Sequence, residues 1–544
     1  MPRNHELDAD VIVVGSGGAG LTAAILAHDH GARVVVMERS DKVGGTTAVS
    51  GGAVWVPLNH HMADVGANDS RNEALAYCKT LTAGRAPDEL IEAFVDTGHE
   101  MVRYLEDHTP LRFGVWVMPD YHPSVAGAKL GGRSLEPQLF DKRTLGTWEE
   151  KLRPAPLFLF PVTLQEATFT YQATLKPWNL PSDLMIERLE QGIVACGNAL
   201  VAALLKGCLD RGITIMLDTR GRELLTEHGR VVGLRAERDG SDVIATARGG
   251  VVLASGGFEW NDELRAEFLP GPVTHPNSPP FNEGDGLIMA AEVGAGLGNM
   301  TEVWGSPTGA IPGEAYEGRP LGRLLVPERA CPHSILVNRS GRRFANEGAS
   351  YNELGKAFND IEPNTREYRN QPCWAIFDRQ YRERYPVLTV LPDDPDPEWL
   401  ACDETMAGLA CKLGIEPDGL QATVARWNEA VRGGTDQDFG RHKNPMDLGA
   451  PHASMGTIER PPFYALPVYQ GTLGTKGGPR TNARGQVLNV RGSVIPGLYA
   501  AGNVMASVAG PAYYGGGAPI GLAMTWGYLC GIHAAAAAKS DASC

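Results

Sequence analysis

The clearest hydrophobic pattern lies near the start of the chain, where Asp10-Val11-Ile12-Val13-Val14 contains an uninterrupted β-branched run. Such a run is typical of a strand buried on both faces of a parallel sheet. It leads into the glycine-rich segment 15–20 and a helical pattern over 21–30, after which 33–37 predicts a second buried strand. A helix over 197–211 and a strand over 213–217 repeat the alternation. The pattern predicts an α/β fold with a Rossmann-like unit.

The turn between the first strand and helix carries a Gly-x-Gly-x-x-Gly motif at Gly15, Gly17 and Gly20. Gly15 permits the tight turn, Gly17 lets a pyrophosphate approach the backbone, and Gly20 lets helix and strand pack closely. Glu38 follows the second strand, near the spacing at which a carboxylate accepts hydrogen bonds from ribose hydroxyls. The segment therefore predicts a dinucleotide site. Its expected contacts are Gly15, Gly17, Gly18, Ala19, Gly20, Glu38 and Arg39.

Further glycine-rich segments favour FAD over NAD. The segment 44–52 supplies the small residues and hydroxyls that a long cofactor needs, and two more buried strands end in glycine, at 250–257 and 497–503. No second dinucleotide motif stands between a strand and a helix, so we expect electrons to leave through an external acceptor such as a quinone. The expected cofactor contacts here are Gly45, Thr46, Thr47, Ser50, Gly51, Gly52, Ala254, Gly256, Gly502, Asn503, Pro519 and Ile520.

The C-terminal region carries a pattern that suits ketone chemistry. Tyr513-Tyr514-Gly515-Gly516-Gly517-Ala518-Pro519-Ile520-Gly521 sets a phenol beside bare backbone amides, just before a helical pattern over 522–537. Two donors aimed at a carbonyl oxygen stabilise the negative charge that it gains when a neighbouring C–H bond loses its proton. The positive end of the following helix would favour negative charge on a reduced flavin.

Together these segments resemble the fumarate reductase and succinate dehydrogenase flavoprotein superfamily. That resemblance implies a glutathione-reductase-type FAD domain interrupted by an α+β substrate-capping domain. Within the superfamily, the C-terminal pattern is similar to that of the 3-ketosteroid Δ1-dehydrogenases. The segments Pro119-Asp120-Tyr121-His122, Asn346-Glu347-Gly348-Ala349-Ser350-Tyr351 and Leu473-Gly474-Thr475-Lys476-Gly477-Gly478 agree with it.

The resemblance implies removal of a hydride from steroid C1 to flavin N5 and of a proton from C2. Tyr351 matches the proton-abstracting base, and Tyr121 matches the tyrosine that hydrogen-bonds to this base and relays the proton. Tyr513 and Gly517 match the phenol and the amide that bind the C3 carbonyl. A tyrosine base has an ordinary pKa near 10, so it needs a neighbouring donor. Each tyrosine also has a packing alternative, Tyr121 as a loop aromatic and Tyr351 as the anchor of a helix over 352–358.

Two differences from other members of the superfamily restrict the expected substrate and the expected mode of FAD binding. The segment 472–478 replaces the His-His-Thr-Met-Gly-Gly type of segment found in relatives that grip small dicarboxylates, which argues against fumarate. Thr46 and Thr47 stand where covalently flavinylated relatives carry histidine, so we expect noncovalent FAD. A Δ4-(5α)-dehydrogenase, a desaturase of smaller cyclohexanone-type ketones and a flavin-bearing steroid-binding protein remain as alternatives.

The expected FAD domain comprises residues 1–280 and 452–544, and the cap 281–451. Pro/Asn-rich turns at 270–280 and 445–451 mark the cap's limits. Inside it, 334–344 reads as a hairpin. An unusually aromatic insert, 152–183, contains Phe158, Phe160, Phe169, Tyr171 and Trp178. Its expected roles are to cap the pocket, to lean on a membrane or to change the substrate.

The composition argues against several other classes of protein. The net charge of −15, without a basic run, argues against nucleic acid. Nine scattered cysteines without Cys-x-x-Cys predict reduced thiols and neither a disulfide framework nor a metal site. The polar first ten residues predict no signal peptide, and no apolar run reaches the length of a membrane span. We therefore expect a cytoplasmic protein, with peripheral membrane contact left open.

Overall fold

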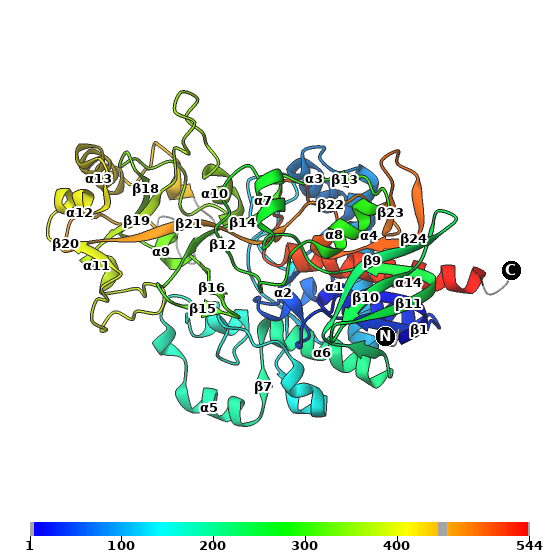
Figure 1. Ribbon diagram of the computed structural model, residues 1–544. Helices are drawn as coiled ribbons and strands as arrows, with labels where there is room; N and C mark the ends of the chain where they lie inside the picture. Colours follow the sequence, from blue (N-terminus) through cyan, green and yellow to red (C-terminus); the bar gives the residue numbers. More distant parts are fainter. Residues whose placement is uncertain (1–4, 444–453, 542–544) are drawn as a thin grey trace.

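A computed structural model of the chain describes residues 5–443 and 454–541 and forms two lobes, one of which carries both termini (Figure 1). The core of that lobe is a sheet in the order β23-β24-β11-β1-β2-β8. The β-branched run forms the end of β1, which is parallel to β2 and β11. The strands are β1 His5–Val14, β2 Val34–Met37, β8 Thr214–Met216, β9 Thr219–Glu227, β10 Arg230–Arg238, β11 Ser241–Leu253, β23 Gln486–Leu488 and β24 Val494–Ala500. The predicted α/β fold is confirmed.

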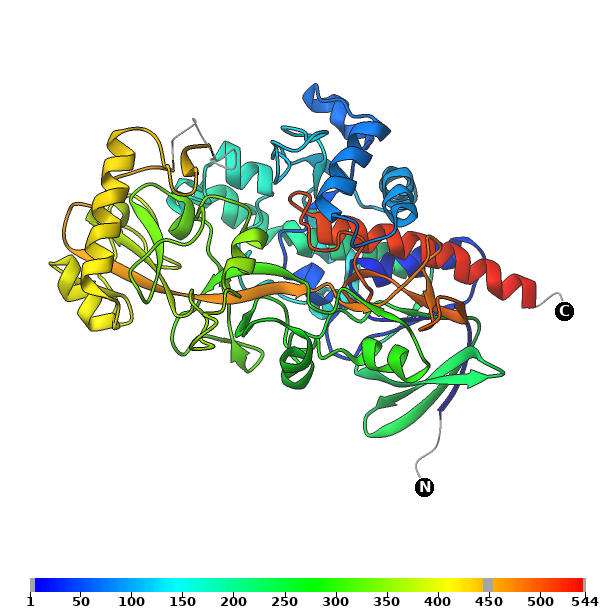
Figure 2. The ribbon, with the colours of Figure 1, turned by 90° about the horizontal axis from the view of Figure 1, so that it is seen from above.

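Close helix packing covers this sheet, with α1 (Gly18–Asp29) against both α14 (Ala518–Asp541) and α6 (Cys196–Asp210). Glycines in α14 permit the approach, since a Cβ on Gly527 would lie 2.3 Å from the carbonyl oxygen of Ala19. By length and composition α14 could cross a membrane, but 61% of its apolar window is buried in the protein. Its packing is that of a core helix (Figure 2).

The second lobe, here called the cap lobe, is built on a sheet in the order β17-β14-β21-β19-β18. Successive side chains of β18 point to opposite faces of the sheet. Ile335 and Val337 pack in a hydrophobic cluster with α12 and α13, and Leu336 packs in another with α10 and α11. The elements are β12 His275–Pro276, β14 Val303–Gly309, β17 Arg323–Leu324, α9 Pro327–Ala330, β18 Ser334–Asn338, α10 Tyr351–Ala357, β19 Cys373–Asp378, α11 Arg379–Arg382, β20 Ala401–Asp403, α12 Met406–Leu413, α13 Pro417–Arg432, η5 Arg441–Lys443 and β21 Phe463–Thr475.

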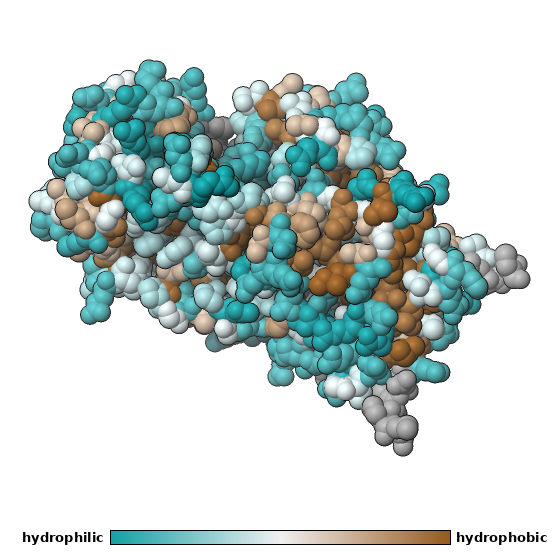
Figure 3. Space-filling model, turned by 45° about the horizontal axis from the view of Figure 1, so that its top comes forward, coloured by the Kyte–Doolittle hydropathy of each residue, from teal (hydrophilic) through white to brown (hydrophobic). Residues whose placement is uncertain are grey.

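Shorter elements surround these two sheets. In the view of Figure 3 the cap lobe is mainly hydrophilic, whereas hydrophobic residues gather on the lobe with the termini. The remaining elements are α2 Gly45–Ala48, β3 Val54–Trp55, η1 His60–Val65, α3 Arg71–Thr82, α4 Asp88–His108, β4 Phe113–Val115, β5 Ser134–Pro137, β6 Phe140–Asp141, η2 Lys142–Lys151, η3 Glu166–Thr170, η4 Pro177–Asn179, α5 Ser182–Glu190, β7 Ile193–Val194, α7 Asp262–Phe268, α8 Asp285–Glu292, β13 Leu297–Gly298, β15 Ala315–Tyr316, β16 Arg319–Pro320, β22 Gly478–Pro479 and η6 Gly502–Val504.

Sheet pairing differs from the predicted cap limits of 281–451. β12 and β21 pair in the cap sheet but lie outside that range. The prediction relied on proline-rich boundaries, and one of them, 445–451, lies outside the described residues. β21 is a single long strand that serves the cap before the chain returns to the first lobe at β23. The division into two domains itself stays a prediction.

The predicted hairpin over 334–344 is wrong. β18 pairs with β19, which begins 35 residues after β18 ends, from Asn338 to Cys373. The turn itself forms, because Gly341 adopts the left-handed conformation (φ 67°) and the Asn338 side chain accepts two backbone N–H bonds within it. Beyond the turn, Arg343 is held by an ion pair with Glu347 (2.7 Å), so the chain turns toward α10.

Candidate active site

One cavity of about 900 Å³ extends between the two lobes. The β1–α1 turn, the segment 44–53, the end of β11 and the segment 502–523 line it from the first lobe. Parts of 323–332, together with Gly348 and Tyr351, line it from the cap lobe. The cavity thus joins the segments predicted to hold the cofactor to those predicted to hold the substrate.

The cofactor end of the cavity fits a diphosphate. α1 begins after Gly17, which offers no side-chain cap. The N–H of Gly18 donates to the Thr47 hydroxyl (3.0 Å), and those of Ala19 and Gly20 are available to an anion. A Cβ on Gly17 would meet nothing closer than 3.6 Å, which leaves room for a ligand. Gly15 needs glycine for another reason, since its φ is 106° and a Cβ would lie 2.4 Å from the carbonyl oxygen of Ala254.

All predicted cofactor contacts except Gly20 line this cavity. Gly20 has the packing role that the motif implies, because a Cβ there would lie 2.0 Å from the carbonyl oxygen of Gly15. Arg39 lines the cavity while donating to the carbonyl oxygen of Phe281 (2.7 Å) and to Glu283 (2.9 Å). The individual contacts with the cofactor stay predictions.

Glu38 has a function in the protein itself that the sequence did not suggest. Its Oε2 accepts hydrogen bonds from the backbone N–H (3.1 Å) and the hydroxyl (2.6 Å) of Ser16, inside the glycine-rich turn. Its Oε1 accepts from the N–H of Ser40 (3.0 Å). Glu38 therefore braces the turn while it also lines the cavity where a ribose contact is predicted.

Three tyrosines from distant parts of the chain meet at the other end of the cavity. The hydroxyl of Tyr121 donates to that of Tyr351 at 3.0 Å. The ring centroid of Tyr513 lies 5.1 Å from that of Tyr121 and 5.2 Å from that of Tyr351. All three side chains are buried, and all three line the cavity. The structure thus brings together the three predicted catalytic tyrosines.

Gly517 lies four residues after Tyr513 and lines the same cavity. Its φ of 98° favours glycine, and a Cβ would lie 2.4 Å from the carbonyl carbon of Ala53. Within the described part of the chain its N–H has no acceptor. Trp304 holds the Tyr513 ring edge to face at 5.1 Å, while its indole N–H donates to Asn503 (3.0 Å).

The surroundings of Tyr351 shift its pKa in opposite directions. Burial raises the pKa of Tyr351 well above 10, and the nearby Tyr513 acts in the same direction. The hydrogen bond from Tyr121 and the positive charge of Arg329 lower this pKa. The donor that a tyrosine base needs is therefore present, and the proton affinity of Tyr351 depends on both neighbours.

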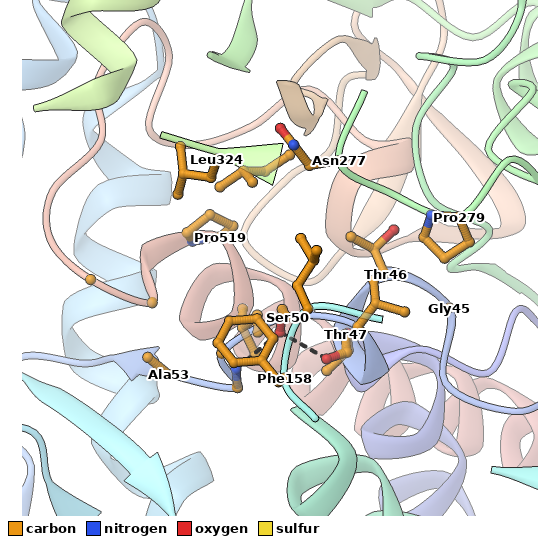
Figure 4. Close-up of a pocket in the computed structure, with 18 of the residues that line it drawn as sticks. Gly45, Thr46, Thr47, Ser50, Ala53, Phe158, Asn277, Pro279, Leu324 and Pro519 are labelled. Atoms are coloured by element: carbon orange, nitrogen blue, oxygen red, sulfur yellow. Dashed lines mark hydrogen bonds between the residues drawn. The ribbon is translucent and has the colours of Figure 1, made fainter. Parts of the chain in front are cut away.

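The aromatic insert lies against the cofactor end of the cavity. Figure 4 shows the Phe158 ring beside Ser50, whose hydroxyl donates to the carbonyl oxygen of Thr47 (2.8 Å). A Cβ on Gly51 would lie 3.3 Å from Leu164 and 3.7 Å from Phe158. The insert also contributes Thr168 and other side chains to the lining. Of its three expected roles, the structure bears out that of capping the pocket.

A family model described as an FAD binding domain matches residues 10–520. The chain belongs to this FAD-binding family. The predicted cofactor is thereby confirmed, and the threonines at 46 and 47 agree with noncovalent binding.

Two relatives of this flavoprotein carry the names of dehydrogenases that act on cyclic ketones. It is 39% identical over 538 residues to 4-oxocyclohexanecarboxylate 2-dehydrogenase of Sinomonas cyclohexanicum, covering 96% of this chain and 92% of that one. It is 36% identical to 3-oxosteroid 1-dehydrogenase of Mycolicibacterium smegmatis, covering 98% of both. The crystal structure of 3-ketosteroid delta1-dehydrogenase from Sterolibacterium denitrificans, in complex with 1,4-androstadiene-3,17-dione, matches with a TM-score of 0.91 and 36% identity over 97% of this chain and 99% of that one.

These comparisons confirm the predicted resemblance and the predicted class, an FAD-dependent oxidoreductase. Sequence reasoning missed Trp304, Arg329 and Lys476 in this flavoprotein. Lys476 lies in a glycine-rich segment that was quoted only for its pattern, and Arg329 lies in a stretch with no motif. The sequence predicted no metal site. One group of possible metal ligands lies away from the cavity lining and consists of His60, His61 and Glu106, whose ligand atoms are within 4.8 Å of one another. Both histidines contact the Glu106 carboxylate through hydrogen bonds or ion pairs.

Lys476 is fully buried. Its Nζ donates to the carbonyl oxygen of Ala512 (2.8 Å) and lies 4.1 Å from the centroid of the Trp304 ring. Burial lowers the pKa of Lys476 to about 7. Since the unfolded chain has the ordinary pKa of roughly 10.4, the folded protein binds fewer protons between these values, and Lys476 makes the stability rise with pH across this window.

Lys476→Met is expected to flatten that pH dependence. The free energy of unfolding of the variant should rise less steeply from pH 7 to 10, by up to about 1.4 kcal/mol per pH unit. Denaturant unfolding of the FAD-loaded protein at pH 7, 8 and 9 measures the slope. Lys412→Met, at an exposed lysine, is the control and should leave it unchanged. Parallel curves for wild type and Lys476→Met would show that Lys476 does not titrate in this window.

Proposed function

We propose that this flavoprotein introduces a C1–C2 double bond into 3-ketosteroids. The carrying observation is the convergence of Tyr121, Tyr351 and Tyr513 in one cavity, with the Tyr121 and Tyr351 hydroxyls 3.0 Å apart. The relatives named 3-oxosteroid 1-dehydrogenase support this substrate class, as does the structural match to a ketosteroid dehydrogenase complex. The assignment of individual residues rests on the family resemblance and on this geometry.

The residues divide the chemistry into two halves. The Tyr513 hydroxyl and the Gly517 N–H donate to the C3 carbonyl oxygen, where they stabilise negative charge as the enolate forms. Tyr351 takes the proton from C2 and Tyr121, hydrogen-bonded to it, relays that proton onward. Bound FAD supplies the acceptor for the hydride that leaves C1. Trp304 positions the Tyr513 ring through an edge-to-face contact, and the insert covers part of the cavity.

A second candidate is desaturation of a monocyclic ketone. It is favoured by the 39% identity to 4-oxocyclohexanecarboxylate 2-dehydrogenase, whose named substrate also contains a cyclohexanone ring. The carbonyl clamp, formed by the donors Tyr513 and Gly517, and the base Tyr351 could act on either ring. These residues therefore do not distinguish between the two substrates. For the Δ4-(5α)-dehydrogenase alternative, the matching structure is 24% identical and supports the fold alone.

Anaerobic reduction of the flavin separates these candidates. Adding 4-androstene-3,17-dione should bleach the flavin absorbance, because this steroid still has a saturated C1–C2 bond. The matched control is 1,4-androstadiene-3,17-dione, in which that bond is already a double bond and which should leave the spectrum oxidised. Bleaching by 4-oxocyclohexanecarboxylate or by a 5α-saturated ketone, with none by 4-androstene-3,17-dione, would overturn the leading assignment.

The electron acceptor and a peripheral membrane contact belong to the same proposal. An external quinone-like acceptor fits the single dinucleotide motif of the sequence. The insert supports a contact with lipid because it exposes Leu159 (69%), Phe160 (50%) and Trp178 (47%) to solvent beside the cavity that it lines. An apolar ketone could pass from lipid to the cavity along this surface. The cytoplasmic location stays a prediction from the sequence.

A further inference from the structure

Arg329 is a buried cation on the wall of the cavity. It lies in α9, is 3% exposed and lines the cavity together with Tyr121 and Tyr351. Its Nε donates to the carbonyl oxygen of Leu325 (3.0 Å), and its Nη1 donates to those of Glu347 and Ala349 (2.9 Å to Ala349). Its hydrogen bonds thus fasten the turn that precedes Tyr351, the first residue of α10.

No carboxylate neutralises this cation. In the described ranges 5–443 and 454–541, Arg329 has no ion pair within 4.0 Å, although two buried glutamates lie near it. The carboxylate of Glu347 pairs instead with Arg343 (2.7 Å) and Arg441 (3.4 Å). Burial raises the pKa of Glu328, which favours its neutral form. The positive charge of Arg329 is therefore directed toward the tyrosines.

The charged and titratable groups around the tyrosine pair give Arg329 a distinct effect. Tyr351 is surrounded by Tyr121, Tyr513 and Arg329, and Tyr121 by Tyr351, Tyr513 and Arg329. Burial and the neighbouring phenols disfavour a negative charge on the pair, while Arg329 favours it. Among the described residues, Arg329 is the cation that acts on both phenols. Burial lowers its own pKa, but a guanidinium keeps its proton in neutral and alkaline solution.

We propose that Arg329 is a positioning residue for proton abstraction, whose charge stabilises the phenolate form of the Tyr121–Tyr351 pair and whose hydrogen bonds fix the turn before Tyr351. The inference rests on the proposed role of Tyr351 as base. In the reactive state the pair holds one proton between two oxygens. When the C2–H bond breaks, its proton forms the O–H bond of Tyr351, and the electron pair passes into the enolate bound by Tyr513 and Gly517. The negative charge thereby moves from the pair to the substrate oxygen.

Three variants separate the charge of Arg329 from its hydrogen bonds. Arg329→Gln and Arg329→His are uncharged in alkaline solution but keep an N–H donor, whereas Arg329→Met loses both the charge and the donors. Ionisation of Tyr351 is read in FAD-loaded protein, without substrate, from the tyrosinate absorbance that is lost in Tyr351→Phe. Arg382→Gln is the matched control, because Arg382 is a buried arginine of the cap lobe that also donates to two backbone carbonyls but does not line the cavity.

The Gln and His variants should each raise the pH of half-ionisation of Tyr351 by about one unit or more, since an opposite charge nearby lowers a pKa by about 1–3 units. Arg329→Met should raise this pH at least as much, and Arg382→Gln should stay near wild type. The rising limb of kcat/KM against pH, measured with the ketone that bleaches the flavin, should move in the same way. The His variant tests the charge if the Gln variant does not fold.

Two results would overturn the proposal. Titrations that coincide in all variants would mean that the charge does not act on the pair, and a shift in the Met variant with none in the Gln and His variants would assign the whole effect to the hydrogen bonds. Because the titration needs no substrate, it decides the role of Arg329 even if no tested ketone is turned over, in which case the proposed function alone fails.

Discussion

Tyr351→Phe is expected to lower kcat by about a hundredfold to ten-thousandfold, the range typical for loss of a general acid–base group. The phenylalanine keeps the ring contacts with Tyr513 but removes the oxygen that takes the C2 proton. Steroid binding should change little, because the carbonyl clamp of Tyr513 and Gly517 is untouched. Single-turnover reduction of the flavin under anaerobic conditions measures the chemical step directly.

Tyr514→Phe is the matched control for this variant. Tyr514 is as deeply buried and adjoins Tyr513 in sequence, but its hydroxyl bonds to Thr82 (2.6 Å) away from the cavity lining. This variant should lose some stability and keep its rate. If Tyr351→Phe reduced the flavin as fast as wild type, Tyr351 would not be the base. If wild type itself bound steroid without any turnover, the steroid-binding alternative would replace the enzyme.

Tyr513→Phe is expected to lower kcat by about a hundredfold to a thousandfold, the usual effect of removing one donor from a developing oxyanion. Ketone binding should weaken as well, because the same hydroxyl bonds to the carbonyl in the ground state. Rapid-mixing reduction of the flavin at several ketone concentrations separates the two effects. A variant with weaker binding but an unchanged limiting rate would show that Tyr513 binds the ketone without stabilising the enolate.

The two tyrosine variants should also differ in their response to pH. The rising limb of the wild-type rate reports ionisation of the base, whose pKa is raised by burial, so activity should increase toward alkaline pH. Tyr513→Phe keeps the base and should keep a rising limb. The residual activity of Tyr351→Phe should lose it.

The sequence predicted the cofactor lobe well because its signals are local. A buried strand, a glycine turn and a helix follow one another within 30 residues, and each glycine has a role visible in the motif. The three tyrosines could be found as well, but only through the resemblance to a known family. Their sequence separation exceeds 100 residues for each pair, so no periodicity links them.

The sequence could not predict strand pairings and side-chain contacts that depend on tertiary packing. Residues 334–344 have the local signature of a hairpin, yet β18 pairs with β19 at the edge of the sheet, where two hydrophobic clusters bury both of its faces. Arg329 belongs to no pattern, and its proposed role depends on the lack of an ion pair within 4.0 Å among the described residues. Burial of Lys476 is equally invisible, since a lysine is ordinarily exposed.

The three tyrosines of the cavity, Tyr121, Tyr351 and Tyr513, belong to two different lobes. The backbone N–H of Tyr121 donates to the carbonyl oxygen of Tyr514 (3.1 Å), which ties Tyr121 to the segment that carries Tyr513, whereas Tyr351 belongs to the cap lobe. Lys356 of α10 bridges the two lobes through a hydrogen bond to the carbonyl oxygen of Pro511 (2.9 Å). A rotation of the cap lobe away from the first lobe would separate the proposed base, Tyr351, from the proposed carbonyl donors, Tyr513 and Gly517. The proposed deprotonation therefore requires the two lobes to be packed together as they are in this structure.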